Sequence, residues 1–295
     1  MTLRRVTRSA AVALAVFLLA PALWRVSAQD LKLPNASGSV KFAVIGDSGS
    51  GSREQFEVGA QMAKYRGVFK YDRVIMLGDN IYGGQTPADL DKKFAQPYKA
   101  LINAGVKFSA ALGNHDSQEN RKYKPFGMDG QRYYTYTMDN VRFFVLDTDQ
   151  LDPAQMKWFE DELKKSQDAK DEWKICYFHH PLYSSGGTHG SDLNLRVVLE
   201  PLFVKYGMNV VFAGHDHIYE RMLPQKGIYY FVSGNAGQLR KGDFKRAAFT
   251  AAGYDQDMTF MLIEISKTSM AFQCITRTGQ VIDSGVLPLQ VRPQP

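Results

Sequence analysis

The stretch Val211-Phe-Ala-Gly-His-Asp-His-Ile-Tyr-Glu-Arg221 combines a short apolar run with two histidines that are separated by one residue. Apolar residues that lead directly into a glycine are typical of a buried strand that ends at a loop. Residues two apart in an extended loop point to the same side, so His215 and His217 can face one pocket. Imidazole is a common metal ligand, although an isolated His-x-His is more often a pair of polar loop residues. The rest of the chain has to decide between these two interpretations.

Three earlier apolar runs end in the same way, with a glycine and then a side chain whose oxygen can bind a metal. They are Gly46-Asp47 after residues 40–45, Gly78-Asp79 after residues 71–77, and Gly113-Asn114 after residues 106–112. Open α/β sheets bind their ligands beyond the carboxyl ends of the strands, so we expect these oxygens at one sheet edge. A fourth run, 173–178, leads directly into His179 and His180. Together these runs favour metal ligation over isolated loop residues.

Tyr82 follows Asp79 by three residues and can turn back toward the same point. A phenol loses its proton readily only on a strong Lewis acid such as a ferric ion; standing alone, Tyr82 would be better explained as an aromatic lid. The candidate metal ligands are Asp47, Asp79, Tyr82, Asn114, His179, His215 and His217. This set exceeds the needs of one tetrahedral ion and contains no cysteine, which argues against a structural zinc site. It suits two ions that share a bridging carboxylate, an arrangement suited to hydrolysis of phosphoesters.

The first 28 residues differ from the rest of the 295-residue chain. An arginine-rich start is followed by an apolar run, 10–23, and by small residues at 26–28, which is typical of a secretory signal peptide. The apolar run is too short for a comfortable membrane span, so an uncleaved anchor is disfavoured, and the pair Arg4-Arg5 leaves twin-arginine export open. The predicted divisions are a signal peptide at 1–28, a linker at 29–38 and one catalytic domain at 39–290. We therefore expect a secreted or periplasmic protein with no stable membrane anchor after cleavage.

The charge of the chain argues against a nucleic-acid partner, and the positions of its cysteines argue against a disulfide. Removal of residues 1–28 takes away four arginines and lowers the formal net charge from +6 to +2. No concentrated run of Lys and Arg remains, so we expect no specific nucleic-acid partner. Cys176 and Cys274 fall in two predicted strands, 173–178 and 271–276, and separate core thiols are favoured over a disulfide, which would need adjacent strands. The sequence does not indicate an oligomeric state.

Five short blocks occur in a fixed order between Asp47 and His217. They are Asp47-Ser-Gly49, Gly78-Asp79-Asn-Ile-Tyr82, Gly113-Asn114-His115-Asp116, Cys176-Tyr-Phe-His179 and Gly214-His215-Asp216-His217. In this order they resemble the calcineurin-like metallophosphoesterases, and Tyr82 narrows the resemblance to the purple acid phosphatases within that family. Cys176 stands where the family pattern usually has valine, at a core position that should tolerate the change. The resemblance covers nearly the whole chain after the signal peptide.

The resemblance implies a ligand set for each of two ions. Fe(III) would be held by Asp47, Asp79, Tyr82 and His217. Asp79 would bridge to a divalent ion (Zn, Mn or Fe(II)) that is also held by Asn114, His179 and His215. His115 would face the phosphate as a general acid or charge stabiliser. His189 is similar to the family's substrate-side histidine, with one residue more between it and His179 than the pattern has.

Three further residues have two interpretations each. His180 either lines the pocket or packs beside Pro181. Asp116 and Asp216 either orient neighbouring histidines or are solvated carboxylates of a turn.

The implied fold belongs to the α/β class: a single-domain, four-layer metallophosphoesterase fold with a two-sheet β-sandwich flanked by helices. Apolar periodicity and turn residues predict helices at 54–66, 88–103, 153–166 and 193–206, a hairpin of 133–138 with 141–146, and strands at 228–233, 258–266 and 271–276. We expect an acid phosphatase that acts on small phosphomonoesters. The alternatives are a phosphodiesterase or nucleotidase on the same scaffold, and a non-catalytic exported protein that binds iron or phosphate. His115 and His189 argue against the last, because ligation alone does not need them.

Overall fold

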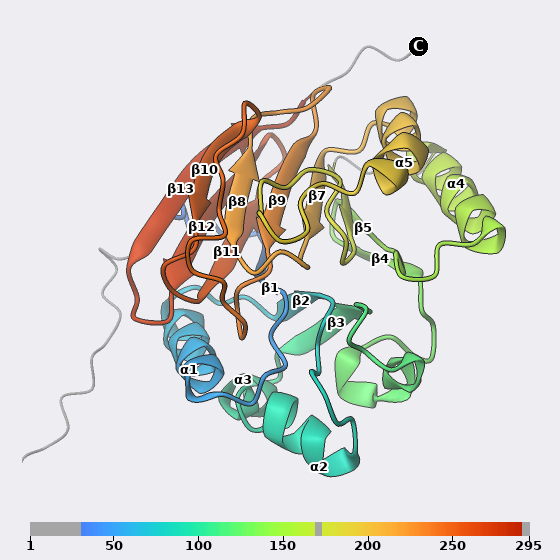
Figure 1. Ribbon diagram of the computed structural model, residues 1–295. Helices are drawn as coiled ribbons and strands as arrows, with labels where there is room; N and C mark the ends of the chain where they lie inside the picture. The colour runs from blue at the N-terminus through green and yellow to red at the C-terminus, as the bar shows by residue number, and fades with distance from the viewer. Residues whose placement is uncertain (1–30, 169–172, 291–295) are drawn as a thin grey trace, which may run out of the picture.

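The computed structural model describes residues 31–168 and 173–290, so the predicted signal peptide at 1–28 lies outside the described residues. Two β-sheets pack face to face, and helices cover both outer faces (Figure 1). The α-helices are α1 (Arg53–Val68), α2 (Pro87–Leu90), α3 (Lys99–Asn103), α4 (Pro153–Asp168) and α5 (Leu193–Tyr206). Shorter helical segments are the π-helix η1 (Asp91–Ala95) and the 3-10 helices η2 (Gln118–Lys122) and η3 (Lys124–Phe126).

The strands divide into a six-stranded and a seven-stranded sheet. The first contains β1 (Val40–Ile45), β2 (Arg73–Leu77), β3 (Lys107–Ala111), β11 (Thr259–Ile265), β12 (Ser269–Thr276) and β13 (Val281–Pro288), in the order β13-β12-β11-β1-β2-β3. The second contains β4 (Tyr134–Met138), β5 (Val141–Val145), β6 (Trp173–Tyr177), β7 (Val210–Ala213), β8 (Tyr219–Met222), β9 (Tyr229–Ser233) and β10 (Thr250–Tyr254), in the order β10-β8-β9-β7-β6-β5-β4.

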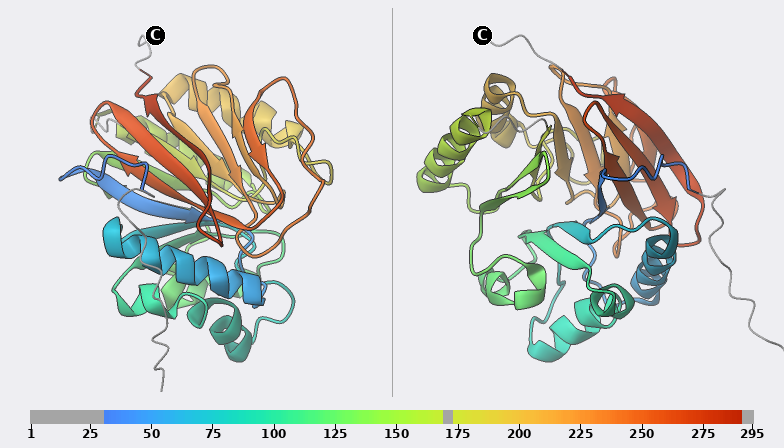
Figure 2. Two further views of the ribbon diagram at one scale, coloured as in Figure 1. Left: turned by 90° about the vertical axis from the view of Figure 1, so that its left-hand side faces the viewer. Right: turned by 180° about the vertical axis from the view of Figure 1, so that it is seen from behind.

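Three separate hydrophobic clusters fill the spaces between four layers. Phe42 of β1 packs edge-on against Phe143 of β5, with ring centroids 5.3 Å apart, and so joins the two sheets. The helices α1 and α3 cover the first sheet, where Tyr65 contacts Phe260. The helices α4 and α5 cover the second sheet, as Figure 2 shows from behind. The predicted four-layer α/β fold is therefore confirmed.

Parallel strands bring the predicted ligands to one edge of each sheet. β1, β2 and β3 run parallel, so the loops that follow them leave the first sheet on the same side. β5, β6, β7 and β9 run parallel in the second sheet and do the same. Short contacts join the two edges: His179 Nδ1 lies 2.9 Å from the Leu77 carbonyl oxygen, and the His215 amide donates to Asp47 Oδ2 at 2.9 Å. The two sheets thus share a single site.

One predicted helix is wrong in its extent. Residues 88–103 form α2, η1 and α3 instead of a continuous α-helix. Pro97 lies between η1 and α3, and proline has no amide hydrogen to continue the helical hydrogen-bond pattern. The helices predicted at 54–66, 153–166 and 193–206 are present, and Asp152 caps α4 by accepting a hydrogen bond from the Gln155 amide at 2.8 Å, as predicted.

The sequence analysis missed three strands. β8, β10 and β13 are short or lie at an edge, and each gains its hydrogen bonds only from a partner strand. β13 alternates between half-buried and exposed residues and contains Gly285, which weakens a strand signal. The predicted 133–138/141–146 hairpin is confirmed by β4 and β5, which pair in register from Tyr134 with Val145 to Met138 with Val141.

The described part of the predicted linker, residues 31–38, contacts the first sheet. The amides of Asn35 and Ala36 donate to the Glu264 carboxylate at 2.6 Å each. Cys176 and Cys274 are buried and free, because they lie in different sheets. Among the helices of the described residues, none is long and apolar enough to cross a membrane.

Candidate metal centre

The structure brings all seven predicted ligands together at the shared edge of the two sheets. One half surrounds the phenol of Tyr82. Its oxygen lies 3.1 Å from Asp47 Oδ1 and 3.1 Å from His217 Nε2, and His217 Nε2 is 3.5 Å from the same carboxylate oxygen. These three side chains come from the loops after β2, β1 and β7. A tyrosine, a carboxylate and an imidazole thus converge on one point.

The other half surrounds His179. Its Nε2 lies 3.0 Å from Asn114 Oδ1, 3.1 Å from His215 Nδ1 and 3.4 Å from Asp79 Oδ1. Asp79 also forms a side-chain hydrogen bond with Tyr82, so its carboxylate contacts both halves. Asp47, Asp79 and His179 place one ligand atom each within 4.8 Å of one another. The arrangement gives two adjacent groups of donors with Asp79 between them.

Unusual backbone geometry holds the ligands in place. Asp47, Asp79 and His215 have positive φ angles of 53°, 50° and 71°. Residues other than glycine adopt this region rarely, and such strain concentrates at functional sites. The preceding glycines are also needed for close approach: a Cβ on Gly113 would lie 2.3 Å from Asp79 Oδ1, and one on Gly214 would lie 2.4 Å from Asp47 Oδ2. The Gly-X pattern seen in the sequence therefore reflects crowding around the ligands.

Burial and neighbouring charges set the pKa values of the ligands in the metal-free protein. Burial raises the pKa of Asp79, but its hydrogen bond with His179 and the charge of that ring outweigh burial and lower the pKa. Burial lowers the pKa of His179, but the Asp47 charge and the contact with Asp79 raise it to about 9. Burial, with the charges of Asp47 and Asp79, raises the pKa of the Tyr82 phenol well above its usual value. At neutral pH His179 and Tyr82 therefore hold protons that a cation has to displace.

Asp116 and Asp216 are structural anchors rather than solvated turn carboxylates. The Asp116 carboxylate accepts hydrogen bonds from the amides of Asn80, Ile81 and Gly113, each at 3.0 Å, and so ties together the loops after β2 and β3. Burial raises the pKa of Asp116 to about 7. Asp216 is fully buried and accepts hydrogen bonds from the Ser184 hydroxyl and the Gly190 amide. Both residues fix loops that carry predicted site residues.

Three further histidines surround the ligands. The rings of His115 and Tyr82 have centroids 4.7 Å apart, and those of His189 and His215 are 4.0 Å apart. His115 and His189 are exposed, so both can contact a molecule that enters from solvent. His180 lines the site instead of merely packing beside Pro181: its ring is 4.5 Å from that of His215, and its Nδ1 lies 2.9 Å from Thr148 Oγ1. Burial lowers the pKa of His180 to about 4, so its ring is neutral at pH 7.

The sequence analysis missed Arg240. Its amide donates to the His217 carbonyl at 3.3 Å, which places this residue beside the Tyr82 half of the site. Its Nη1 is buried, and among residues 31–168 and 173–290 nothing accepts a hydrogen bond from it. Burial lowers the pKa of His189, and the positive charge of Arg240 acts in the same direction. The only signal in the sequence is the basic pair Arg240-Lys241 in a glycine-containing loop after β9.

The donor set fits two metal ions. It offers carboxylate, phenol, amide and imidazole groups without a thiol, which suits hard or borderline cations. The glycines leave no side-chain atoms between the donors, and the lowered pKa of Asp79 keeps its carboxylate charged to compensate cationic charge. Ligand atoms from five loops meet with no lysine or arginine among them.

The Calcineurin-like phosphoesterase family model matches residues 40–219. The chain belongs to this family. The matched region contains all seven predicted ligands, and family membership supports a metal-dependent hydrolase that acts on phosphoric esters.

Curated relatives of this phosphoesterase are purple acid phosphatases at modest identity. Human tartrate-resistant acid phosphatase type 5 is 23% identical over 320 residues, which cover 90% of this chain and 97% of that protein. The Fe(3+)-Zn(2+) purple acid phosphatase 12 of Arabidopsis thaliana is 28% identical over 219 residues, which cover 65% of this chain but only 45% of that protein. The purple acid phosphatase PPD1 from yellow lupin (Lupinus luteus) seeds superposes with a TM-score of 0.69 at 18% identity, over 87% of this chain and 55% of that chain. The last comparison supports the fold.

Proposed function

We propose that the chain is an acid phosphatase that hydrolyses phosphomonoesters with a dinuclear Fe(III)–M(II) centre, where M is zinc, manganese or ferrous iron. The position of Tyr82 carries this proposal. Its phenol oxygen lies within hydrogen-bonding distance of Asp47 and His217, inside a ligand set, where an aromatic lid would not be. Phenolate is a ligand for a strong Lewis acid, and one relative has an iron–zinc pair in its name.

The two halves of the site would each hold one ion. Asp47, Tyr82 and His217 would hold Fe(III); Asn114, His179 and His215 would hold the divalent ion; and Asp79 would bridge the two. When bound, the ions would polarise the phosphoryl group and make a water-derived nucleophile available at moderate pH.

The residues around the ligands would act on the ester itself. His115 is exposed beside Tyr82 and would give its proton to the departing alkoxide, so that the alcohol leaves as a neutral molecule. His189, which stacks on His215, would orient the phosphate from the opposite side. Arg240 has an unpaired buried Nη1 and would supply positive charge for a phosphoryl oxygen.

The predicted signal peptide at 1–28 places this activity outside the cytoplasm, in a secreted or periplasmic protein. A blocked N-terminus at Met1, or a mature protein that retains residues 1–28 in the cytoplasmic fraction, would contradict this part of the proposal. N-terminal sequencing of the protein from its native host would decide it.

Metal analysis and a substrate comparison test the chemistry. The natively purified protein should contain close to one iron and one further divalent ion per chain, and it should be violet because ferric phenolate absorbs visible light. It should hydrolyse p-nitrophenyl phosphate in preference to bis(p-nitrophenyl) phosphate. A strong preference for the diester would favour a phosphodiesterase, and a metal-loaded protein that hydrolyses neither would favour a non-catalytic binding protein.

A further inference from the structure

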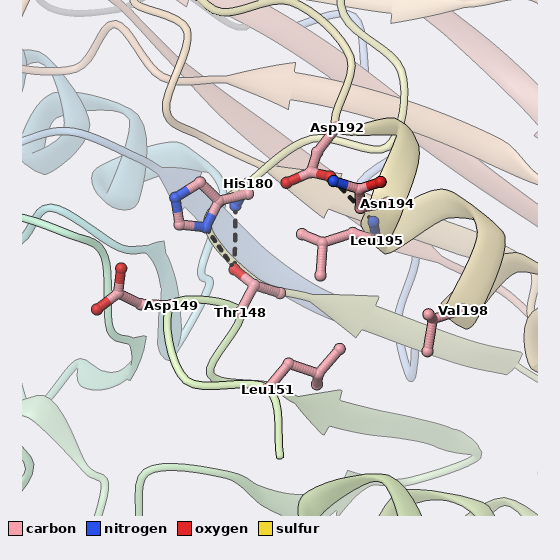
Figure 3. A pocket seen from close by; sticks show the side chains of 8 residues that line it. All are labelled: Thr148, Asp149, Leu151, His180, Asp192, Asn194, Leu195 and Val198. Atoms are coloured by element: carbon pink, nitrogen blue, oxygen red, sulfur yellow. Dashed lines mark hydrogen bonds between the residues drawn. The ribbon is translucent and has the colours of Figure 1, made fainter. Parts of the chain in front are cut away.

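A cavity of about 410 Å³ opens beside the candidate metal centre (Figure 3). It lies between the loop after β5 and the start of α5. Its lining residues are Thr148, Asp149, Leu151, His180, Asp192, Asn194, Leu195 and Val198. We propose that this cavity binds the alcohol part of the substrate and selects an alkyl chain that carries a cationic amine. This inference rests on the proposed hydrolysis of phosphomonoesters and specifies which phosphomonoesters are the substrates.

His180 connects the cavity to the metal centre. On one side its ring contacts those of His179 and His215, with centroids 5.0 Å and 4.5 Å away. On the other side it lines the cavity, where its Nδ1 lies 2.9 Å from Thr148 Oγ1 and its amide donates to the same oxygen at 3.2 Å. Two contacts to one hydroxyl fix the orientation of the imidazole. A phosphate held at the centre can therefore direct its alcohol past His180 into the cavity.

The charge of the cavity favours a cation. Asp149 and Asp192 both line it, and no lysine or arginine does. Asp149 is exposed, and in the described ranges its carboxylate takes part in no hydrogen bond or ion pair. Asp192 uses one oxygen to cap α5, accepting from the Leu195 amide at 2.9 Å, so its second oxygen remains available. Figure 3 shows the His180–Thr148 pair between these two carboxylates, and the charges of both act on His180.

The remaining lining residues favour an alkyl chain. Leu151, Leu195 and Val198 supply apolar surface to the same cavity, and Val198 is 45% exposed. Contact with such apolar surface stabilises bound methylene groups, whereas the carboxylates stabilise the ammonium group of the same chain. A polyanionic leaving group such as a nucleoside diphosphate would face two like charges with no compensating cation. The cavity thus disfavours nucleoside triphosphates as substrates.

Matched substrates test this selectivity. An ω-aminoalkyl phosphate and the n-alkyl phosphate of the same length differ only in the terminal charge, and a series of chain lengths measures how far the cavity reaches. We expect the wild-type enzyme to show a higher kcat/KM for the amino compound than for the n-alkyl compound at low ionic strength. The ratio of these two kcat/KM values should fall as salt is added. A ratio of one or less at every chain length would overturn the proposal.

Charge variants provide the second test. Asp149→Asn and Asp192→Asn should each lower the ratio about twofold to fivefold, and the double variant should lower it further. Asparagine is as good a helix cap as aspartate, so α5 should remain intact in Asp192→Asn. Asp139→Asn is the matched control, because it removes the same charge from the β4–β5 turn at the amino end of β5. If Asp139→Asn changed the ratio as much as the cavity variants, or if those variants left it unchanged, the proposal would be wrong.

A positive charge added to the cavity rim and a direct measurement of ligand affinity provide two further tests. Val198→Lys places a cation at the exposed rim and should abolish the preference for the amino compound. Calorimetry with a non-hydrolysable ω-aminoalkyl phosphonate should show tighter binding than with its n-alkyl counterpart, and Asp149→Asn should reduce this difference in affinity. Hydrolysis of p-nitrophenyl phosphate by all variants would show that the proposed function stands, so that a missing preference counts against the cavity alone. Loss of that hydrolysis in the wild type would count against the proposed function instead.

Discussion

The phenol oxygen of Tyr82 lies 3.1 Å from Oδ1 of Asp47, although the two residues come from the ends of different strands. This contact distinguishes the site from a set of carboxylates and histidines alone. In the metal-free protein the phenol holds its proton, because burial and two carboxylates raise its pKa. Only a strongly polarising cation can replace that proton.

Tyr82→Phe should therefore abolish the visible absorption band of the purified protein while leaving the fold intact. The ring keeps its contact with His115, and only the phenol oxygen is lost. Absorption spectroscopy together with iron analysis checks this. Tyr123→Phe, a half-buried tyrosine that contacts Phe94 outside the site, is the control and should stay violet. An unchanged spectrum in Tyr82→Phe would remove the ferric phenolate from the proposal.

Gly113→Ala should disrupt the site. The new Cβ would lie 2.3 Å from Asp79 Oδ1 and 2.4 Å from its amide nitrogen, so both the carboxylate and the backbone of Asp79 have to move. Overpacking of this kind costs about 1–3 kcal/mol of unfolding free energy. Gly67→Ala in α1 is the matched control: no atom lies within 4 Å of its Cβ, and the change should stabilise the helix by about 0.5–1 kcal/mol. Denaturant unfolding and metal content of both variants measure the difference; similar results for the two would contradict the crowding argument.

Metal binding should depend on pH through His179. Its pKa in the metal-free protein is raised to about 9, so below pH 9 a cation has to displace a proton from the ring. Affinity for Zn²⁺ should accordingly rise about tenfold per pH unit between pH 6.5 and 8.5 for each proton displaced. Calorimetry of the metal-free protein in buffers of different ionisation enthalpy counts these protons. His179→Gln should release about one proton fewer; equal release from variant and wild type would assign the proton to another group.

Arg240→Gln should weaken substrate binding. Arg240 Nη1 is buried and has no acceptor within the described part of the chain, so it can donate to a phosphoryl oxygen, and hydrogen bonds to charged groups contribute about 1.5–3 kcal/mol. We expect kcat/KM for p-nitrophenyl phosphate to fall at least tenfold, mainly through a higher KM. Lys241→Gln, which removes the neighbouring exposed charge, should change it less than twofold. Equal effects of the two variants would indicate general electrostatic attraction rather than a specific contact.

Local sequence patterns predicted most strands and helices and the candidate ligands at the strand ends. Apolar runs that stop at glycine predicted β1, β2, β3 and β7, and a run that leads directly into a histidine predicted β6. The polar residues that follow these runs are the candidate ligands Asp47, Asp79, Asn114, His179 and His215. The strand predictions are confirmed because strand periodicity and the steric need for glycine are local properties. Pro97, also a local signal, was overlooked, and it divides the predicted 88–103 helix.

Which side chains meet depends on the packing of the two sheets. Asp47 contacts the His215 amide across 168 positions of sequence, and such contacts depend on how two sheets pack rather than on any local pattern. The same holds for β8, which pairs with β9 and β10, and for Arg240, whose place beside His217 has no counterpart in sequence spacing. The cavity beside His180 is likewise a product of packing, since its lining comes from three segments. Long-range packing, which leaves no periodic trace in a single chain, therefore converts a series of loop residues into a site.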